Sequence, residues 1–451
     1  MNYSRWSTES EVKNILKEVD TCSKMEKSGI PMGCNGDKLL IKDDVSHSLV
    51  ISAPGSGKTQ AIMLPLIKSS IKANDCFLVN DIKGELLDKT SGELKREGYN
   101  VIVLDYANLK IGNHYNILSL PYHLYKNSNK DDAITLLENV GYYLMHDDND
   151  NADIFWEKTS IDYFVGLALY LFENAKEKEI NLNSLFSLSN DIFNAKKDYS
   201  KLIMESLDKH SSTYQFLSST LFAPEETRGG IIATFSQRVK RFVSREMLSN
   251  MMATSDFDIL GINNEKTAIF AISGNSEEAN ALISILFNQV FYSIDNSDNK
   301  ENRFNFIIDE FDSMKTIKDF YSKINYARGI NIRITAFIKS FTNLNNIYGE
   351  KNKDLIRLCF DNIIYLFAND IYTLEEISKL CGNTSKGPLI SVEELKVINN
   401  FEEIILMPRM YPIRTKVIPD YELDWNFDDT TVIFNSLEKV DIAFFDIDNL
   451  L

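Results

Sequence analysis

The chain has 451 residues, and its 48 Lys and Arg against 65 Asp and Glu give a net charge of −17. At roughly 100–200 residues per domain, this length predicts two to four structural units. Apolar residues make up 44% and charged residues 25%, a composition that excludes disordered and fibrous proteins. The acidic balance disfavours a protein that coats duplex DNA with its whole surface, because phosphate binding needs a positive face. A local basic channel remains compatible with it.

The sequence predicts no ordinary transmembrane helix, because no run of 18 consecutive apolar residues occurs. Its best candidate, Ile161–Phe172, contains Asp162 and predicts a buried helix instead. The N-terminal residues lack the apolar core of a signal peptide. An odd number of scattered cysteines predicts free thiols in a reducing compartment, not a metal site or disulfides. These are Cys22, Cys34, Cys76, Cys359 and Cys381.

Short β-branched runs separated by helical stretches occupy the first and last thirds of the chain. Near-continuous apolar strands with helices between them predict an α/β fold, with a parallel sheet covered on both faces. The runs are Leu49–Ile51, Phe77–Val79, Val101–Leu104, Ala268–Ile272, Phe306–Ile308, Ile332–Ile338, Ile363–Phe367 and Ile404–Leu406.

The middle of the chain has a different pattern. From about residue 129 to residue 250, apolar residues recur with a period near 3.6 and strand candidates are few. This periodicity predicts an all-helical insertion. The stretch after Pro419 mixes acidic and aromatic residues, and we expect a loosely packed tail there.

The strongest motif is Ser52–Thr59, which follows a predicted strand and opens a predicted helix at Gln60–Ser70. The pattern GxxxxGK[ST] builds a loop whose backbone N–H groups converge on the β-phosphate of a nucleotide. Lys58 is expected to reach the β- and γ-phosphates, and Thr59 to ligate Mg²⁺. Ser52 replaces the first glycine of the pattern. The candidate nucleotide-binding residues are Pro54, Gly55, Ser56, Gly57, Lys58, Thr59 and Gln60.

An acidic partner for this loop lies at the end of the apolar run that precedes Asp309 and Glu310. Asp309 is expected to hold Mg²⁺, and Glu310 to polarise the water that attacks ATP. A solvated acidic turn is the alternative, which the upstream loop makes less favourable. Roughly 250 positions separate these acids from Lys58, so the spacing independently predicts a large insertion.

Two further residues are candidates for phosphate sensing. Arg328 lies 18 positions after Glu310, just before a predicted strand, and an arginine there could reach the γ-phosphate bound by a neighbouring subunit. Lys339 ends the same strand, where many P-loop ATPases place a polar sensor. For both residues, a solvated surface cation is the alternative.

A basic cluster near the end of the helical block is a candidate DNA contact. Helical spacing places three of its four cations on one face, where they could meet phosphates. A solvated face balanced by nearby acids is the alternative. The cluster comprises Arg238, Lys240, Arg241 and Arg245. Aromatic residues such as Tyr142, Tyr143 and Phe155 are predicted to be core residues, not base-stacking groups.

Several segments, taken in order, resemble the coupling proteins of type IV secretion and conjugation, the TraG/TraD-like family. The likeness runs from about Ser4 to Tyr421. Its motifs are Ser4-Arg5-Trp6-Ser7, Asp81-Ile82-Lys83-Gly84-Glu85-Leu86 followed by Thr90, Gly98-Tyr99-Asn100-Val101, Asn116-Ile117-Leu118, Phe155-Trp156-Glu157-Lys158, Asp309-Glu310-Phe311, Arg328-Gly329, and Gly382 at the end of Ser-Lys-Leu-Cys-Gly.

The resemblance implies a RecA-like P-loop motor domain that carries an all-α domain and assembles as a ring-shaped homo-hexamer. It implies an ATPase that uses ATP and Mg²⁺ and receives cargo, either a relaxase or relaxosome with single-stranded DNA, or a secreted protein. By that likeness, Arg328 acts on the neighbouring subunit. We expect residues 1–122 and 256–420 to form the nucleotide-binding domain, 123–255 the all-α domain, and 421–451 an acidic tail.

Three departures from the family pattern shape the expected function. Ser52 replaces a glycine, Lys339 stands where glutamine is usual, and the family's N-terminal transmembrane pair is missing from this sequence. We therefore expect a soluble form, cytoplasmic and peripheral at the inner face of the cell membrane, held there by a membrane anchor protein beside the channel ATPases. The alternatives are a slow or non-hydrolysing cargo adaptor and another hexameric DNA translocase.

Overall fold

The computed structural model describes residues 3–146, 154–194, 199–274 and 276–449. The chain divides into two compact units. A sheet unit comprises Met1–Ile102, Gly261–Ile272 and Ile294–Ile433. A helical unit comprises Val103–Leu260, Ser273–Ser293 and Phe434–Leu451.

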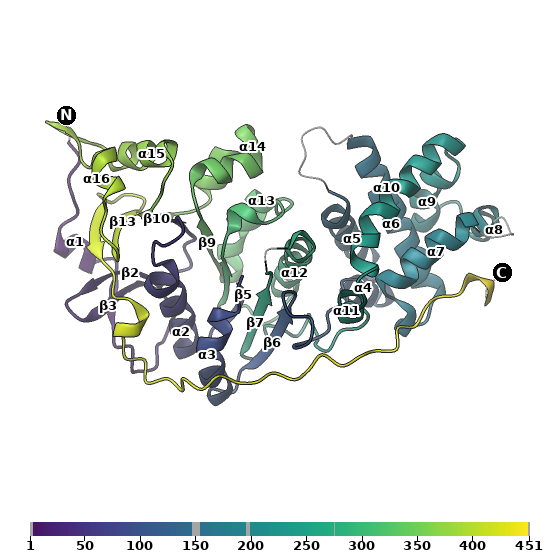
Figure 1. Ribbon diagram of the computed structural model, residues 1–451, viewed down its shortest axis with the longest axis horizontal. Helices are drawn as coiled ribbons and strands as arrows, with labels where there is room; N and C mark the ends of the chain where they lie inside the picture. Colours follow the sequence, from purple (N-terminus) through teal and green to yellow (C-terminus); the bar gives the residue numbers. More distant parts are fainter. Residues whose placement is uncertain (1–2, 147–153, 195–198, 275, 450–451) are drawn as a thin grey trace. The chain divides into compact units, whose positions relative to one another are not determined.

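A nine-stranded, mostly parallel sheet organises the described residues (Figure 1). Parallel pairing runs without interruption from β10 to β7, and β13 and β14 extend the sheet in antiparallel pairing. This is the α/β fold that the apolar runs predict. In spatial order the strands are β14 (Ile413–Lys416), β13 (Glu402–Leu406), β10 (Asn362–Phe367), β4 (Ser48–Ser52), β9 (Ile332–Ile338), β8 (Phe304–Ile308), β5 (Cys76–Asn80), β7 (Thr267–Ile272) and β6 (Asn100–Asp105).

The central strands are apolar along their whole length because both faces of the sheet are covered. Every residue of β4, β5, β8 and β9 is buried, as expected where crossover helices pack on a parallel sheet. Neighbouring strands come from distant parts of the chain, so early strands in purple and blue lie among late ones in green (Figure 1). The helices of this unit are α1 (Glu9–Lys13), α2 (Leu64–Ala73), α3 (Glu85–Arg96), α13 (Phe320–Ala327), α14 (Phe341–Leu358), α15 (Ile371–Cys381) and α16 (Val392–Lys396).

A small antiparallel sheet that the sequence did not predict precedes the phosphate loop. Its order is β1 (Lys17–Val19), β3 (Lys38–Lys42) and β2 (Ile30–Asn35). Pro31 and Gly33 interrupt the strand signal in β2, and the pairing of β2 with β3 shifts register between Pro31 and Cys34. A strand that contains both residues gives no uninterrupted apolar run, which explains the omission.

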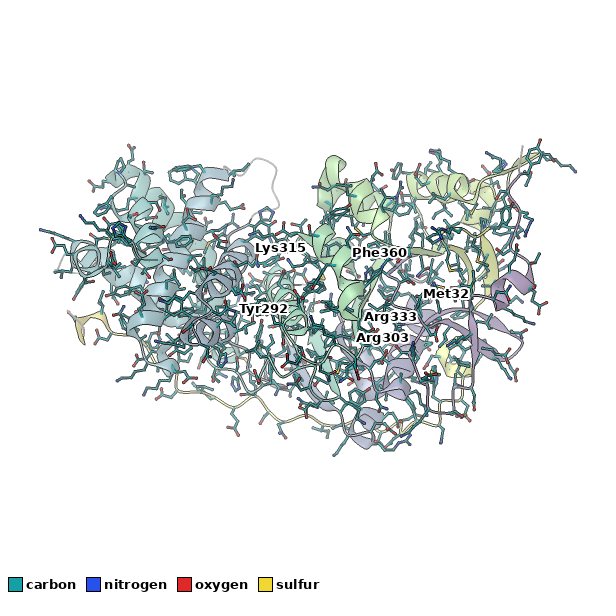
Figure 2. All side chains as sticks on the ribbon, turned by 180° about the vertical axis from the view of Figure 1, so that it is seen from behind. Met32, Tyr292, Arg303, Lys315, Arg333 and Phe360 are labelled. Atoms are coloured by element: carbon teal, nitrogen blue, oxygen red, sulfur yellow. The ribbon has the colours of Figure 1, made fainter. Side chains whose placement is uncertain are left out.

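Two buried arginines attach this small sheet to the large one. Arg303 and Arg333 lie close together (Figure 2), and both donate to the carbonyl of Ser28, at 2.7 and 3.0 Å. The hydroxyl of Ser28 bonds in turn to the Asp75 carboxylate. Burial, followed by the nearby charge of Arg303, lowers the pKa of Arg333 to about 9. Hydrogen bonding to several partners offsets part of the cost of burying these charges.

The helical unit is built around α6, whose residues from Tyr163 to Phe172 are buried. The predicted buried helix at Ile161–Phe172 is thereby confirmed, and Tyr143 is buried as expected. Phe155 is 49% exposed, so its assignment to the core was wrong. The helices are α4 (Ser119–Lys126), α5 (Lys130–Met145), α6 (Ile154–Asn174), α7 (Leu182–Asn194), α8 (Tyr199–Ser206), α9 (Ser212–Leu221), α10 (Glu225–Val243), α11 (Glu246–Met251) and most of α12 (Glu277–Asp295).

Helix α12 was expected within the nucleotide-binding domain, but residues up to Ser293 group with the helical unit. The amides of Asn288 and Gln289 explain this, since they donate to the Tyr143 hydroxyl at 2.7 Å and to the Ile117 carbonyl at 2.8 Å. Over the part of the chain that the structure describes, no helix is long and apolar enough to cross a membrane.

The C-terminal segment has little regular structure and is mostly exposed, as expected of a loosely packed tail, but a few of its side chains are buried. Trp425 is 2% exposed and packs with Leu39 and Ile41 in the sheet unit. Within the helical unit, Phe445 and Ile447 are buried. The sequence signal of mixed acids and aromatics is therefore that of an extended segment anchored by its aromatic residues.

Candidate functional site

The phosphate loop follows β4 and adopts the backbone geometry that anion binding requires. Gly55 and Gly57 have φ values of 82° and 80°, in the left-handed region that glycine adopts without cost. Alternating left- and right-handed residues turn successive N–H groups into one concave, anion-binding nest. Ser52 is the last residue of β4. Its extended backbone does not need glycine, so its replacement introduces no strain.

The helix after the loop differs from the predicted Gln60–Ser70. A π-helical turn, η1 (Thr59–Met63), comes first and α2 begins at Leu64. Pro65 explains the irregular start, because proline lacks the N–H that would bond to the carbonyl four residues earlier. Such π turns are common at functional sites. Thr59 thus stands at the first turn, beside the loop.

The two predicted acids lie at the carboxyl end of β8, opposite the loop. Lys58 forms an ion pair with Asp309, and the Asn80 amide donates to the Asp309 carbonyl at 2.9 Å. Burial raises the pKa of the Asp309 carboxyl, while the facing Lys58 ammonium opposes that shift. Glu310 has a φ of 47°, a left-handed conformation that is uncommon outside glycine and often marks functional turns.

Lys339 lies at the end of β9, the strand between β4 and β8. Its ammonium pairs with the Glu310 carboxylate at 3.1 Å, and its backbone N–H donates to Asp312 at 2.8 Å. Burial raises the pKa of Asp312. The structure therefore pairs each of the two predicted acids with a lysine.

Several buried polar atoms around the loop have no hydrogen-bond partner within the described protein. Buried polar groups are almost always satisfied, so a cluster of unsatisfied ones suits a polar ligand. The atoms are the hydroxyls of Ser52 and Ser56 and the oxygens Gln60 Oε1, Asn80 Oδ1 and Asp312 Oδ1. The described residues contain no group of three or more His, Cys, Asp and Glu side chains suited to a metal. Mg²⁺ fits such a site, because it takes most of its ligands from water and nucleotide phosphates.

Arg328 lies at the amino end of the central strand β9, opposite the carboxyl ends where the phosphate loop and the acids lie. It begins η4 (Arg328–Ile330), just before β9, whereas Lys339 follows the other end of that strand. Seven residues at about 3.3 Å each span roughly 20 Å. The Arg328 side chain is 44% exposed. One subunit cannot bring it to its own phosphate loop.

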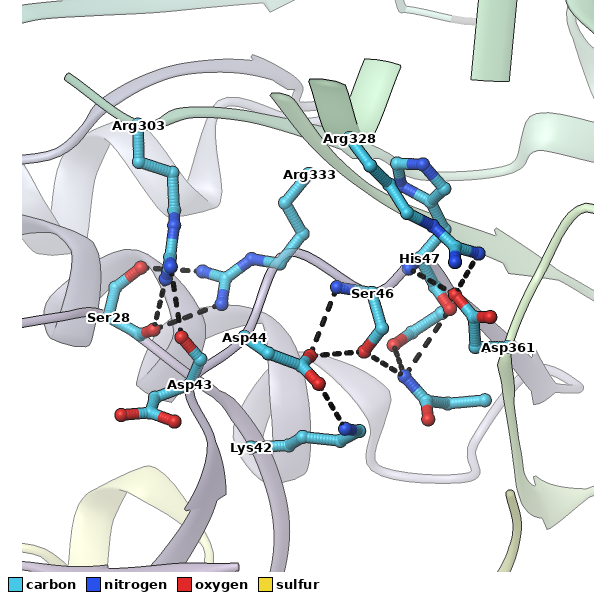
Figure 3. Close-up of polar contacts among 12 residues, drawn as sticks. Ser28, Lys42, Asp43, Asp44, Ser46, His47, Arg303, Arg328, Arg333 and Asp361 are labelled. Carbon is cyan, nitrogen blue, oxygen red and sulfur yellow. Dashed lines mark hydrogen bonds and ion pairs between the residues drawn. The ribbon is translucent and has the colours of Figure 1, made fainter. Parts of the chain in front are cut away.

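A polar network holds Arg328 in place (Figure 3). Its guanidinium pairs with Asp361, whose carboxylate also accepts the backbone N–H of His47 at 3.1 Å. The His47 ring accepts the N–H of Ile334 at Nδ1 and donates from Nε2 to the Ile324 carbonyl. Burial, reinforced by the Arg328 charge, lowers the pKa of His47 to about 3. A neutral ring thus ties α13 to β9 on both sides of Arg328.

The motif segments of the N-terminal half play structural roles. Asp81 directly follows β5, and its carboxylate accepts three N–H bonds from the start of α3, at 2.8–3.0 Å. Burial outweighs these bonds and raises the pKa of Asp81 to about 6. Ser4 bonds to the carbonyl of Cys381 at 2.6 Å, and its Cβ would lie 3.0 Å from a Cβ on Gly382. Two motifs far apart in sequence therefore meet.

The predicted basic cluster belongs to the helical unit. Arg241 pairs with Glu277 and Glu278, and Arg245 pairs with Glu278 at 3.1 Å. Because α10 ends at Val243 and Arg245 has an extended backbone, the expected single helical face is wrong beyond residue 243. Lys240 is exposed and Arg238 is half-buried.

Sequence reasoning missed four residues near the site or beside Arg328. Asn80 and Asp312 flank the acids, Asp361 holds Arg328, and Phe401 contacts the loop. Asn80 directly follows a predicted strand and was in principle detectable. The others come from turns whose neighbours are set by the tertiary fold.

These observations define a class: a P-loop nucleotide-binding fold of RecA-like type, in which one strand separates the loop strand from the acidic strand. A family model for the type IV secretory system conjugative DNA transfer proteins matches residues 5–410, and the chain belongs to that family. A curated relative, the conjugal transfer protein TraG of Escherichia coli, is 20% identical over 428 residues. The match covers 85% of this chain but only 64% of TraG, so the chain spans less than two thirds of that relative.

Solved structures support the fold. The bacterial conjugative coupling protein TrwBdeltaN70 in its unbound monoclinic form aligns with a TM-score of 0.70 at 16% identity, covering 96% of this chain and 95% of that one. TrwB in complex with the ATP analogue ADPNP gives 0.69 at 15%, covering 96% of each. VirB4 of Thermoanaerobacter pseudethanolicus gives 0.50 at 12% identity, covering 89% of this chain and all of that one.

Proposed function

We propose that this chain is an ATP-driven coupling protein that delivers cargo to a type IV secretion or conjugation channel. The observation that carries the proposal is the convergence of Lys58, Asp309 and Glu310 on a glycine nest surrounded by unsatisfied polar atoms. Family membership supports it, as do the structures of TrwB with ADPNP and with ADP and Mg²⁺.

Each residue has a distinct part in ATP hydrolysis. The N–H groups of the Gly55–Gly57 nest hold the β-phosphate, and Lys58 exchanges its Asp309 partner for phosphate oxygens. Thr59 and Asp309 would hold Mg²⁺, and the metal would supply positive charge that offsets the charge on the phosphates. Glu310 orients and polarises the attacking water, after its carboxylate leaves Lys339.

Arg328 completes the site of a neighbouring subunit. Its place at the amino end of β9, away from its own phosphate loop, supports action between subunits. An arginine supplied by a neighbouring subunit stabilises charge on the transferred phosphoryl group. A closed ring repeats one head-to-tail interface at every subunit. We propose a homo-hexamer of this kind.

The cargo is proposed to be a relaxase with single-stranded DNA or a secreted protein. The chain would work at the inner face of the cell membrane, attached through an anchor protein beside the channel ATPases. The basic cluster is the proposed DNA contact. Arg241 and Arg245 already pair with Glu277 and Glu278, so phosphates would compete for them, and exposed Lys240 is the more accessible cation.

A cargo adaptor with slow hydrolysis is the second candidate. The Lys339 ammonium on Glu310 favours it, since a carboxylate held by a lysine is a weaker base towards water. Steady-state phosphate release, measured with and without single-stranded DNA, separates the two candidates. Turnover that DNA accelerates supports the motor, and nucleotide binding without turnover supports the adaptor.

The active site is tested with two variants. Lys58→Ala should lose both MgATP binding and turnover, because it removes the phosphate-binding cation. Glu310→Gln should retain binding, yet release phosphate about 100-fold or more slowly, which is the usual contribution of a general base. Binding is measured by calorimetry, and turnover by phosphate release.

A matched control is Lys13→Ala, which removes an exposed lysine also paired with an acid, Glu9. It should leave binding and turnover unchanged. Normal ATP turnover by folded Lys58→Ala protein would overturn the assignment of the site.

A further inference from the structure

Phe401 occupies an unusual position beside the phosphate loop. It lies between α16 and β13 with a φ of 60°, in the left-handed region that a bulky residue rarely adopts. Its carbonyl accepts the N–H of Val417 at 2.8 Å, so the residue that follows β14 fixes the turn. Strained conformations of this kind persist where the surrounding fold determines them and tend to gather at functional sites.

The strained turn places the Phe401 ring against the loop. A Cβ built on Gly57 would lie 3.0 Å from Cε1 of that ring, so the ring occupies the space that any other residue at position 57 would need. Phe401 is only half-buried. Part of its aromatic surface is therefore free beside the residues that hold phosphates.

Tyr421 is a second aromatic residue at this place. Its ring stands at 80° to that of Phe401, with centroids 6.3 Å apart, and Tyr421 is 66% exposed. Perpendicular aromatic pairs at this distance are favourable. The pair thus combines an exposed tyrosine with a half-buried phenylalanine, so both rings retain surface that a ligand can reach.

The turn that carries Tyr421 is attached to the phosphate-loop helix. It forms η5 (Asp420–Glu422), which packs against η1. Asp420 pairs with Lys68 of α2 at 2.8 Å, and both side chains are buried. A buried ion pair fixes the position of its two segments, because separating the partners would leave a buried charge without a counter-charge. The ion pair thus holds the turn that carries Tyr421 against the helix that follows the loop.

We propose that Phe401 and Tyr421, the aromatic pair, form the platform on which the base of the bound nucleotide stacks. This inference rests on the proposed function. The base is joined to the phosphates through a single ribose, so an aromatic surface in contact with the loop lies within its reach. Stacking uses the face of a base and reads no edge. Tyr421, the first residue of the segment expected to be an acidic tail, is accordingly part of the wall of the nucleotide site.

The test compares two ligands that differ in the base. MgATP and Mg-tripolyphosphate are titrated by calorimetry into the full chain, as wild type and as Phe401→Leu, which retains an apolar contact with Gly57. Phe401→Leu should weaken MgATP binding by roughly 10- to 100-fold, the range of one base–aromatic stack. It should leave tripolyphosphate binding unchanged. Phe401→Tyr should restore MgATP affinity.

Three further measurements make the result decisive. Tyr421→Ala should weaken MgATP binding less than Phe401→Leu, again sparing tripolyphosphate. Phe222→Ala removes an exposed aromatic residue of the helical unit and should change neither affinity. The 2-aminopurine analogue of ATP should lose fluorescence on binding wild type, and less so on binding Phe401→Leu, because stacking quenches it.

The outcomes separate the platform from the site itself. Equal loss of both ligands in Phe401→Leu, or no loss of either, would overturn the platform while the phosphate site stands. Failure of wild type to bind either ligand would instead overturn the proposed function. If Phe401→Leu does not fold, unquenched 2-aminopurine on wild-type protein is sufficient to reject stacking, and quenching supports it.

Discussion

Glu403 on β13 is fully buried, and neither carboxylate oxygen has a hydrogen-bond partner among the described atoms. Burial raises the pKa of this carboxyl well above its usual range. The folded state therefore holds a proton that the unfolded chain releases, so stability falls as pH rises above the unfolded pKa. Glu403→Gln removes that loss. We expect its free energy of unfolding to exceed that of wild type by at least about 1 kcal/mol at pH 8, and by less near pH 4.

The adjacent residue provides a control of opposite sign. Burial alone would raise the pKa of Glu402, but hydrogen bonds from Arg414 and Asn399 outweigh it and lower the pKa. Its contribution to stability is present above the unfolded pKa and is lost as pH falls. Glu402→Gln should therefore destabilise the protein near neutral pH, with the difference shrinking in acid. Denaturant unfolding from about pH 2.5 to pH 8 measures both, because the contribution of Glu402 is lost only below its unfolded pKa. Parallel pH profiles for the two variants would contradict the assignment.

At the residue scale, sequence predicted chemistry better than contacts. The phosphate loop and the acids Asp309 and Glu310 were predictable, because short motifs of adjacent residues indicate their roles. The partners of Lys58 and Lys339 depend on which strands lie side by side. Phe401 carries no signal at all, since its conformation and its contact with Gly57 arise only from the folded turn.

At the scale of elements, helix α3 contains a glycine that we expect to be more stabilising than alanine. Gly92 lies inside this helix, where alanine would normally be more stable by about 0.5–1 kcal/mol. A Cβ there would lie 2.3 Å from the Thr430 carbonyl oxygen and 2.6 Å from that of Asp428. The C-terminal segment crosses the helix at this point, held by hydrogen bonds to Ser91 and Glu93.

Gly92→Ala should therefore displace the crossing segment. We expect a lower melting temperature and faster amide hydrogen exchange over residues 426–432, because the collision is with backbone atoms that cannot turn aside. The matched control is Gly229→Ala in α10, where a Cβ meets nothing within 4 Å, and where the melting temperature should hold or rise. Unchanged exchange in Gly92→Ala would show that the segment does not depend on this crossing.

Elements with one uninterrupted signal were predictable. The β-branched runs predicted every strand of the large sheet except β14, and the 3.6-residue period predicted the all-helical block that α5 to α11 form. Strand β2 was not predicted because Pro31 and Gly33 break its pattern, and β1 is too short, with a single apolar residue, to give a signal. The apolar run of β3 was a missed signal. The grouping of α12 with the helical unit was also hidden, since it rests on amides such as Asn288 that bond to a distant tyrosine.

At the scale of the whole molecule, Lys58 and Arg328 lie at opposite ends of the parallel strands. Lys58 lies at the carboxyl ends of the strands. Arg328 lies at their amino ends, where Asp361 and His47 hold it. The order of motifs along the chain identifies both residues. It does not show the distance between them, because that distance depends on the directions of the strands that carry them. We therefore expect a site that uses both residues to combine Lys58 of one subunit with Arg328 of another.

Mixing two inactive variants tests this arrangement. Lys58→Ala and Arg328→Ala should each turn over little ATP under conditions that favour assembly. In an equal mixture, an interface that pairs the intact loop of an Arg328→Ala subunit with the intact arginine of a Lys58→Ala subunit regains both groups. Random mixing creates about one such interface in four, so the mixture should recover up to roughly a quarter of wild-type phosphate release if interfaces act independently.

The control mixes Lys58→Ala with the double variant Lys58→Ala, Arg328→Ala, which contains no intact loop and should recover nothing. A binding measurement on Arg328→Ala should give normal MgATP affinity, since its own loop is complete. A mixture no more active than its separate components, from proteins shown to form mixed oligomers, would mean that Arg328 does not act across an interface. The ion pair with Asp361 would then be its whole role, and Asp361→Ala would lower stability without affecting turnover in the assembled protein.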